Sequence, residues 1–142
     1  MGIWKKLFGE DSAGVDYYRE GVELLKVSKY HEALTSFRLA LREAPDDAAV
    51  LQQIAIAYTR IGMTDEAVKT YRTVLASHPQ ASGAHYGLGF LLLRQGHTED
   101  AERHLRAFLA APPDGPEAQR HVKHAQEALD EMARGVAPEA ES

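Results

Sequence analysis

The sequence of 142 residues contains no cysteine, so disulfides and cysteine-ligated metal sites are excluded. A chain without cysteine fits a reducing compartment, and we expect a cytoplasmic location. No apolar run approaches the roughly 18 residues that a membrane-spanning helix needs. No apolar core segment with a small-residue cleavage site follows the first lysines, so a secretory signal peptide is not expected.

The sequence also lacks a broad excess of positive charge. Its 16 Lys and Arg residues are outnumbered by 21 Asp and Glu residues, and the formal net charge is -5. Proteins that bind nucleic acid backbones usually cluster basic residues on one face, so nucleic acid is not an expected partner. The apolar fraction of 44% and charged fraction of 26% are typical of one folded globular unit of this length.

No pattern in the sequence indicates catalysis. A glycine-rich phosphate-binding loop is absent. Acidic pairs stand where helices are expected to begin, such as Asp65 with Glu66 and Glu99 with Asp100. Carboxylates in a first helical turn stabilise the helix dipole, which explains these pairs better than acid-base chemistry does. We therefore expect no enzymatic activity, no catalytic residue and no cofactor.

The seven histidines are the remaining candidates for chemistry. His121 and His124 lie three residues apart on one predicted helix, a spacing at which two imidazoles can share a metal. No carboxylate motif of a zinc enzyme accompanies them, so surface histidines are the preferred interpretation and no metal site is predicted. Solvated positions are also expected for three others, namely His31, His97 and His104.

An internal repeat runs through the chain. Three alanines and three prolines recur at one constant interval: Ala33, Ala67 and Ala101, then Pro45, Pro79 and Pro113. A similar short turn precedes each alanine, in the stretches SKYHEA, GMTDEA and GHTEDA. The repeated turns indicate that one structural unit is used three times.

Helices are predicted between these turns, because apolar residues recur there at spacings of three and four. Gly62 and Gly96 suit the left-handed residue after a helix end, and Thr64 and Thr98 suit N-caps. The pattern predicts helices over 14–28, 30–43, 48–61, 65–77, 82–95, 99–111 and 116–134. No useful stretch alternates with period two, so an all-α chain is predicted.

In these residues the sequence resembles the tetratricopeptide repeat family, in which helix-turn-helix units of about 34 residues stack side by side. Small residues carry the resemblance at close helix contacts: Gly21, Ala55, Gly89 and the three alanines above. The resemblance implies a right-handed superhelical solenoid with units at 14–47, 48–81 and 82–115. A capping helix over 116–134 and a disordered tail over 135–142 complete it. Glu20 replaces a usual apolar residue, as expected at an uncovered end.

The resemblance also implies a function, because first helices of this family line a concave groove that grips a peptide. The corresponding positions, here called the groove residues, are mostly apolar: Val15, Tyr18, Val22, Leu25, Gln52, Ile56, Thr59, Tyr86, Phe90 and Leu93. They predict binding of an apolar peptide or helix from another protein. For four of them the alternative is packing between adjacent first helices: Val22, Ile56, Phe90 and Leu93. The polar tips of Tyr18, Gln52 and Tyr86 favour exposure.

Charged residues near the groove narrow the choice of ligand. A subgroup of the family holds the C-terminal carboxylate of a heat-shock protein with Lys, Asn and Arg side chains. Those positions are occupied here by Tyr18, Val22, Gln53, Gly83 and Gly87, so no such clamp is expected. Basic residues recur at the repeat interval beside the groove, at Lys26, Arg60 and Arg94. They form either a basic rim that selects acidic ligand residues or solvated helix ends that complement the dipole.

Residues 1–13 are predicted to form an amphipathic N-terminal tip and a hinge. The tip, MGIWKKLF, pairs large apolar side chains with two lysines. In a helix, Ile3, Trp4, Leu7 and Phe8 share one face. Three uses stay open: docking in a groove of the same chain or of a second copy, weak contact with a membrane surface, or cover for the exposed end of the first repeat. The predicted function is a non-catalytic scaffold with a self-docking or oligomerising N-terminal segment. The alternative is a membrane-peripheral assembly factor anchored by that segment.

Overall fold

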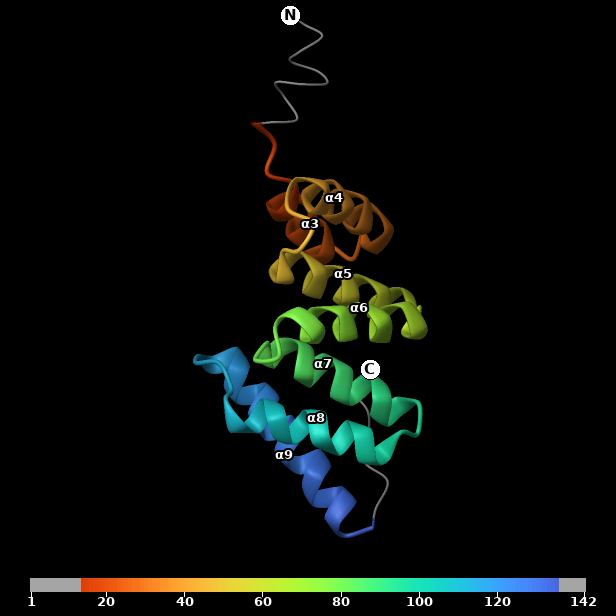
Figure 1. Ribbon diagram of the computed structural model, residues 1–142, viewed down its shortest axis with the longest axis vertical. Coiled ribbons are helices and arrows are strands. Elements are labelled where there is room, and N and C mark those ends of the chain that lie inside the picture. Colours follow the sequence, from red (N-terminus) through yellow and green to blue (C-terminus); the bar gives the residue numbers. More distant parts are fainter. Residues whose placement is uncertain (1–13, 136–142) are drawn as a thin grey trace, which may run out of the picture.

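The computed structural model describes residues 14–135 of the chain. Within that range the regular structure consists of seven α-helices (Figure 1). Their bounds are α3 (Tyr17–Lys26), α4 (Tyr30–Glu43), α5 (Ala48–Ile61), α6 (Thr64–Ser77), α7 (Ser82–Arg94), α8 (Thr98–Ala110) and α9 (Pro116–Ala133). The helices stack as the pairs α3 with α4, α5 with α6 and α7 with α8, and α9 packs on the last pair. The predicted all-α solenoid is confirmed.

From α4 onward, both members of each pair follow the period of the sequence repeat. The predicted start of the first helix at residue 14 is wrong, because α3 begins at Tyr17. The first helices α5, α7 and α9 begin at positions 48, 82 and 116, and the second helices α4, α6 and α8 begin at 30, 64 and 98. Both series advance by the interval that separates the repeated alanines. Helix α9 therefore stands in register as the first helix of a fourth pair. No second helix follows it within residues 14–135.

The turns inside the pairs explain where the helices end. Gly62 and Gly96 adopt the predicted left-handed conformation, with φ of +92° and +85°. The N-cap prediction for Thr64 and Thr98 is wrong, because both are the first residue of their helix. Met63 occupies the N-cap position before Thr64 and makes no side-chain capping bond. Its N–H is bonded to the preceding helix, so one residue closes α5 and starts α6.

The core is divided into three clusters along the stack: the first is shared by α3, α4 and α5, the second by α5 to α8, and the third by α7, α8 and α9. Phe37 is 0% exposed in the first cluster and Phe108 is 1% exposed in the third. Glycines allow the helices of a pair to approach. A Cβ atom at Gly21 would lie 2.4 Å from the Phe37 ring, and one at Gly89 would lie 2.7 Å from Leu105. The small residues of the repeat are therefore required by packing.

Candidate protein-binding surface

The first helices lie on the inner side of the stack. Helix α3 contacts α5, and α5 contacts α7, whereas the second helices make fewer contacts with one another. In a curved stack the elements approach most closely on the concave side, so α3, α5 and α7 line that side. We call this surface, made by the groove residues, the inner face.

The inner face of α3 and α5 is partly exposed and mostly apolar. The groove residues on these two helices all have intermediate burial: Tyr18, Val22, Leu25, Gln52, Ile56 and Thr59. Val15 has the same intermediate burial but lies before α3, which begins at Tyr17. Tyr18, Val22 and Leu25 rest on the first core cluster and still present part of their surface. The Thr59 hydroxyl donates to the Ala55 carbonyl at 2.8 Å, so its polarity is satisfied within the helix.

The inner face of α7 is covered by α9. Tyr86 is 7% exposed and Phe90 is 2% exposed. The Tyr86 hydroxyl lies 2.9 Å from His124 Nδ1, within hydrogen-bond distance, and the Tyr86 ring stacks on His121 at 4.4 Å. The Phe90 ring stacks on His124 at 4.2 Å with an interplanar angle of 8°. The expected exposure of Tyr86 is wrong, because α9 occupies the next first-helix position.

His121 and His124 therefore act in packing. Both imidazoles lie on aromatic rings of α7, and among residues 14–135 no three metal-ligating side chains converge. The sequence held a signal for this arrangement: His124 follows Phe90 by one full repeat interval, so it occupies a groove position of a fourth first helix. Extending the repeat by one more helix would have found the contact.

The predicted basic rim lies at the C-terminal ends of the first helices. Lys26, Arg60 and Arg94 are exposed and stand in the last turns of α3, α5 and α7. Lys26 Nζ is 3.4 Å from a carboxylate oxygen of Glu23. All three cations complement the helix dipoles, and selection of acidic ligand residues remains a prediction.

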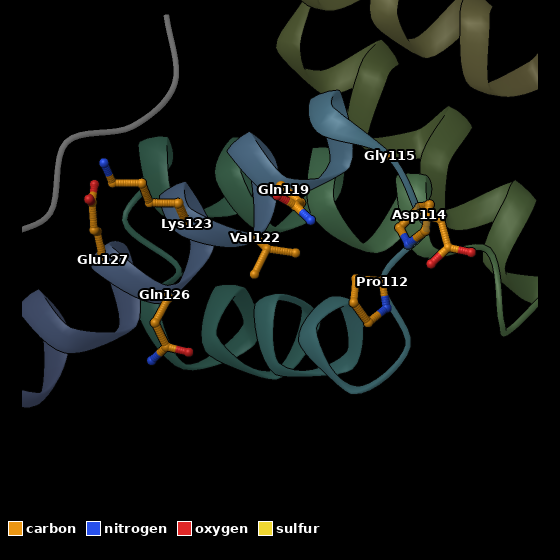
Figure 2. A pocket seen from close by; sticks show the side chains of 9 residues that line it. Pro112, Asp114, Gly115, Gln119, Val122, Lys123, Gln126 and Glu127 are labelled. Atoms are coloured by element: carbon orange, nitrogen blue, oxygen red, sulfur yellow. The ribbon is translucent and has the colours of Figure 1, made fainter.

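The outer side of α9 is polar and faces a hollow of about 630 Å³ beside the loop before α9 (Figure 2). Gln119, Lys123 and Gln126 are exposed and line this hollow. In register they correspond to residues of α7 that face α8, such as Gly89, whose Cβ would meet Leu105. The hollow is thus where the second helix of a fourth pair would pack. Pro112, Pro113 and Val122 also line the hollow, beside the exposed polar side chains of α9 that suit an end of the stack.

A second histidine pair joins α7 to α8. The Nδ1 atoms of His85 and His104 are 3.0 Å apart, and His85 Nε2 is 2.8 Å from the Pro79 carbonyl oxygen. A carbonyl only accepts, so His85 donates from Nε2 and, when neutral, accepts at Nδ1 from His104. The expectation that His104 is solvated is wrong, because its side chain is only 16% exposed.

Acidification is expected to weaken this contact. Burial lowers the pKa of His104 below the ordinary value of 6.5, and the nearby charge of His85 lowers it further. The unfolded chain therefore binds a proton more readily than the folded chain does. The stabilisation is present above pH 6.5 and is lost as the pH falls through the lowered pKa. The free energy of unfolding in urea should decline as the pH falls below 6.5, and this decline should be shallower in His104→Gln. An equal pH dependence in the two proteins would contradict the assignment.

These features define a helical-repeat solenoid, a class of protein that uses extended concave surfaces for binding. The family model described as tetratricopeptide repeat matches residues 24–82 and 62–124. The chain belongs to the tetratricopeptide repeat family. No curated protein matches the chain.

Several solved structures have the same fold. The Sgt2 TPR domain from Aspergillus fumigatus has a TM-score of 0.70 at 21% identity, covering 93% of this chain and 87% of that chain. The first TPR of Spaghetti (RPAP3), bound to the HSP90 peptide SRMEEVD, has 0.69 at 20%, covering 80% and 93%. PcrH in complex with the chaperone binding region of PopD has 0.75 at 17%, covering 89% and 95%. At these identities the likeness shows the fold.

Proposed function

We propose that this chain is a non-catalytic scaffold that binds an apolar peptide or helix of a partner protein on the inner face of α3 and α5. The observation that carries the proposal is the difference in burial along the inner face. Val22 and Ile56 keep exposed surface, whereas their counterpart Phe90 is covered by α9. A ligand therefore has two first helices available to it. The peptide complexes of RPAP3 and PcrH support a partner that is a protein.

The lining favours an amphipathic helix or an extended apolar segment. Aromatic and aliphatic groups from Tyr18, Val22 and Ile56 accept apolar side chains that recur at spacings of three and four. Lys26 and Arg60 stand at one end of the same surface, where acidic ligand residues beside the apolar ones are favoured. The cytoplasm is the proposed location.

Substituting Ile56 is expected to abolish most binding. Peptides selected from a displayed random library provide the probe, with affinity measured by isothermal titration calorimetry. Ile56→Asp should weaken a selected apolar peptide about tenfold or more, because a carboxylate would be desolvated on docking. Gln119→Asp introduces the same charge on the outer side of α9 and should leave the affinity unchanged.

The peptide SRMEEVD is the matched negative probe. The inner face offers Tyr18, Val22 and Gly83 where a carboxylate clamp needs cations and amides, so no measurable binding is expected. Binding of SRMEEVD at the inner face would contradict the proposed ligand chemistry. An Ile56→Asp affinity equal to wild type would contradict the proposed location.

The N-terminal segment is proposed as a self-docking or oligomerising element. Its apolar residues Ile3, Trp4, Leu7 and Phe8 lie outside the described residues. Of the helices within residues 14–135, none has the length and apolarity needed to cross a bilayer. Anchoring of the segment at a membrane surface remains the alternative and is tested together with docking below.

A further inference from the structure

Helix α3 presents a face that α5 and α7 bury. On α5, Ile54 is 5% exposed and shares a core cluster with Ala40 of the preceding second helix. On α7, Leu88 is 0% exposed and shares a cluster with Val74. Glu20 occupies the same position of the repeat on α3 and is exposed. This face of α3 is the one that a preceding second helix would cover.

The hydrophobic surface of this face is also uncovered. Val27, at the C-terminal end of α3, is 63% exposed, more than Met63 at 43%, the other exposed large apolar side chain among the described residues. The counterpart of Val27 is Ile61, which is partly buried against the first core cluster. Three acidic residues accompany Val27 along the helix: Asp16, Glu20 and Glu23, all exposed. A fitting occupant therefore carries both apolar and basic side chains.

The residues before α3 stand in register for that position. Helices α4 and α6 end at Glu43 and Ser77, and the same period places the end of a preceding second helix at residue 9. Residues 1–9, MGIWKKLFG, thus align with 35–43 of α4. Residues 10–16 would connect this segment to α3, which begins at Tyr17, whereas the connections that follow α4, α6 and α8 are the shorter stretches 44–47, 78–81 and 111–115.

With this alignment, residues 1–9 and the exposed face of α3 carry complementary charges. Lys6 aligns with Ala40 and Val74, the residues that cluster with Ile54 and Leu88. Glu20 aligns with Ile54 and Leu88. At the α4–α5 and α6–α7 junctions these two positions hold apolar residues of one core cluster, whereas at the first junction they hold Lys6 and Glu20, which are oppositely charged.

A second pair of aligned positions is polar at the α4–α5 junction and apolar at the first junction. Trp4 aligns with Arg38, whose Nη2 donates to the Tyr58 hydroxyl at 2.9 Å. Leu24 aligns with Tyr58 and is partly exposed on α3. A polar pair at the later junction thus corresponds to an apolar pair, Trp4 with Leu24, at the first.

We propose that residues 1–9 dock on this face of α3 in the same chain, in the position of a second helix, with Lys6 against Glu20 and Trp4 against Leu24. This refines the self-docking role proposed above and places the segment away from the inner face. The equivalent step from a second helix to the next first helix is spanned by 44–47, 78–81 and 111–115, so residues 10–16 are long enough for it. The docked segment leaves the inner face free for a partner protein.

Trp4 is the chain's one tryptophan, so its fluorescence reports on this segment alone. Acrylamide quenching of the full chain should show a protected Trp4. Glu20→Lys should lower the ratio of docked to free segment about fivefold, since it replaces an attraction by a repulsion. The charge swap Lys6→Glu with Glu20→Lys should restore protection. Glu127→Lys makes the same charge change on the exposed side of α9 and should have no effect.

Several results would overturn the proposal. These are a wild-type Trp4 as accessible as in an unstructured peptide, protection in Glu20→Lys equal to that of the wild type, and failure of the charge swap to restore protection. Protection that rises with protein concentration would assign the segment to a second copy. Protection that appears only with phosphatidylserine vesicles would assign it to a membrane surface. The peptide affinity of the inner face should be unchanged in Glu20→Lys, so this proposal and the proposed function fail separately.

Discussion

Replacing Phe37 by alanine is expected to lower the free energy of unfolding by about 3–5 kcal/mol. The Phe37 side chain is 0% exposed, belongs to the first core cluster and fills the space that Gly21 leaves open. The loss is a large part of the roughly 5–15 kcal/mol that stabilises a domain of this size. Urea unfolding followed by circular dichroism measures it.

Arg42→Ala provides the control for this substitution. Arg42 is exposed on the same helix, so the change in stability should stay within about 0.5 kcal/mol. A Phe37→Ala protein as stable as Arg42→Ala would show that the first two helices are not held together by this cluster.

A carboxylate at position 129 is expected to detach α9 from the stack. Leu129 is 6% exposed and shares the third core cluster with Tyr86, Phe90 and Phe108. Leu129→Asp should lower the free energy of unfolding by several kcal/mol, because the charge has no partner in an apolar cluster. It should also raise the rate of amide hydrogen exchange in α7, whose inner side α9 covers.

The matched variant Gln119→Asp places the same charge on the exposed side of α9. It should leave both the unfolding free energy and the exchange of α7 near their wild-type values. Rapid exchange of α7 in this variant as well, or slow exchange in Leu129→Asp, would contradict the covering role of α9.

The helices and their order were predictable from sequence because the same signals recur in successive repeats. The regular recurrence of Pro45, Pro79 and Pro113 fixes the register, and Gly62 and Gly96 mark the turns through their backbone conformation. The threonine caps failed for a local reason. The preceding helix closes on Met63 itself, which moves the cap one residue earlier.

The inner face was only partly predictable. Groove positions on α3 and α5 have the partial exposure that binding requires, but Tyr86 and Phe90 do not. A pattern restricted to three repeats cannot show that a fourth first helix places His124 on Phe90. The contact of His104 with His85 was missed because it depends on how closely two helices approach, which residue type alone does not give.

The most direct test of binding at the inner face is amide hydrogen exchange of the full chain with and without a selected apolar peptide. We expect protection to increase in α3 and α5, around Val22 and Ile56, and to stay unchanged in α9. Protection confined to α9 and the hollow beside Lys123, with none in α3 or α5, would contradict the assignment of the binding surface.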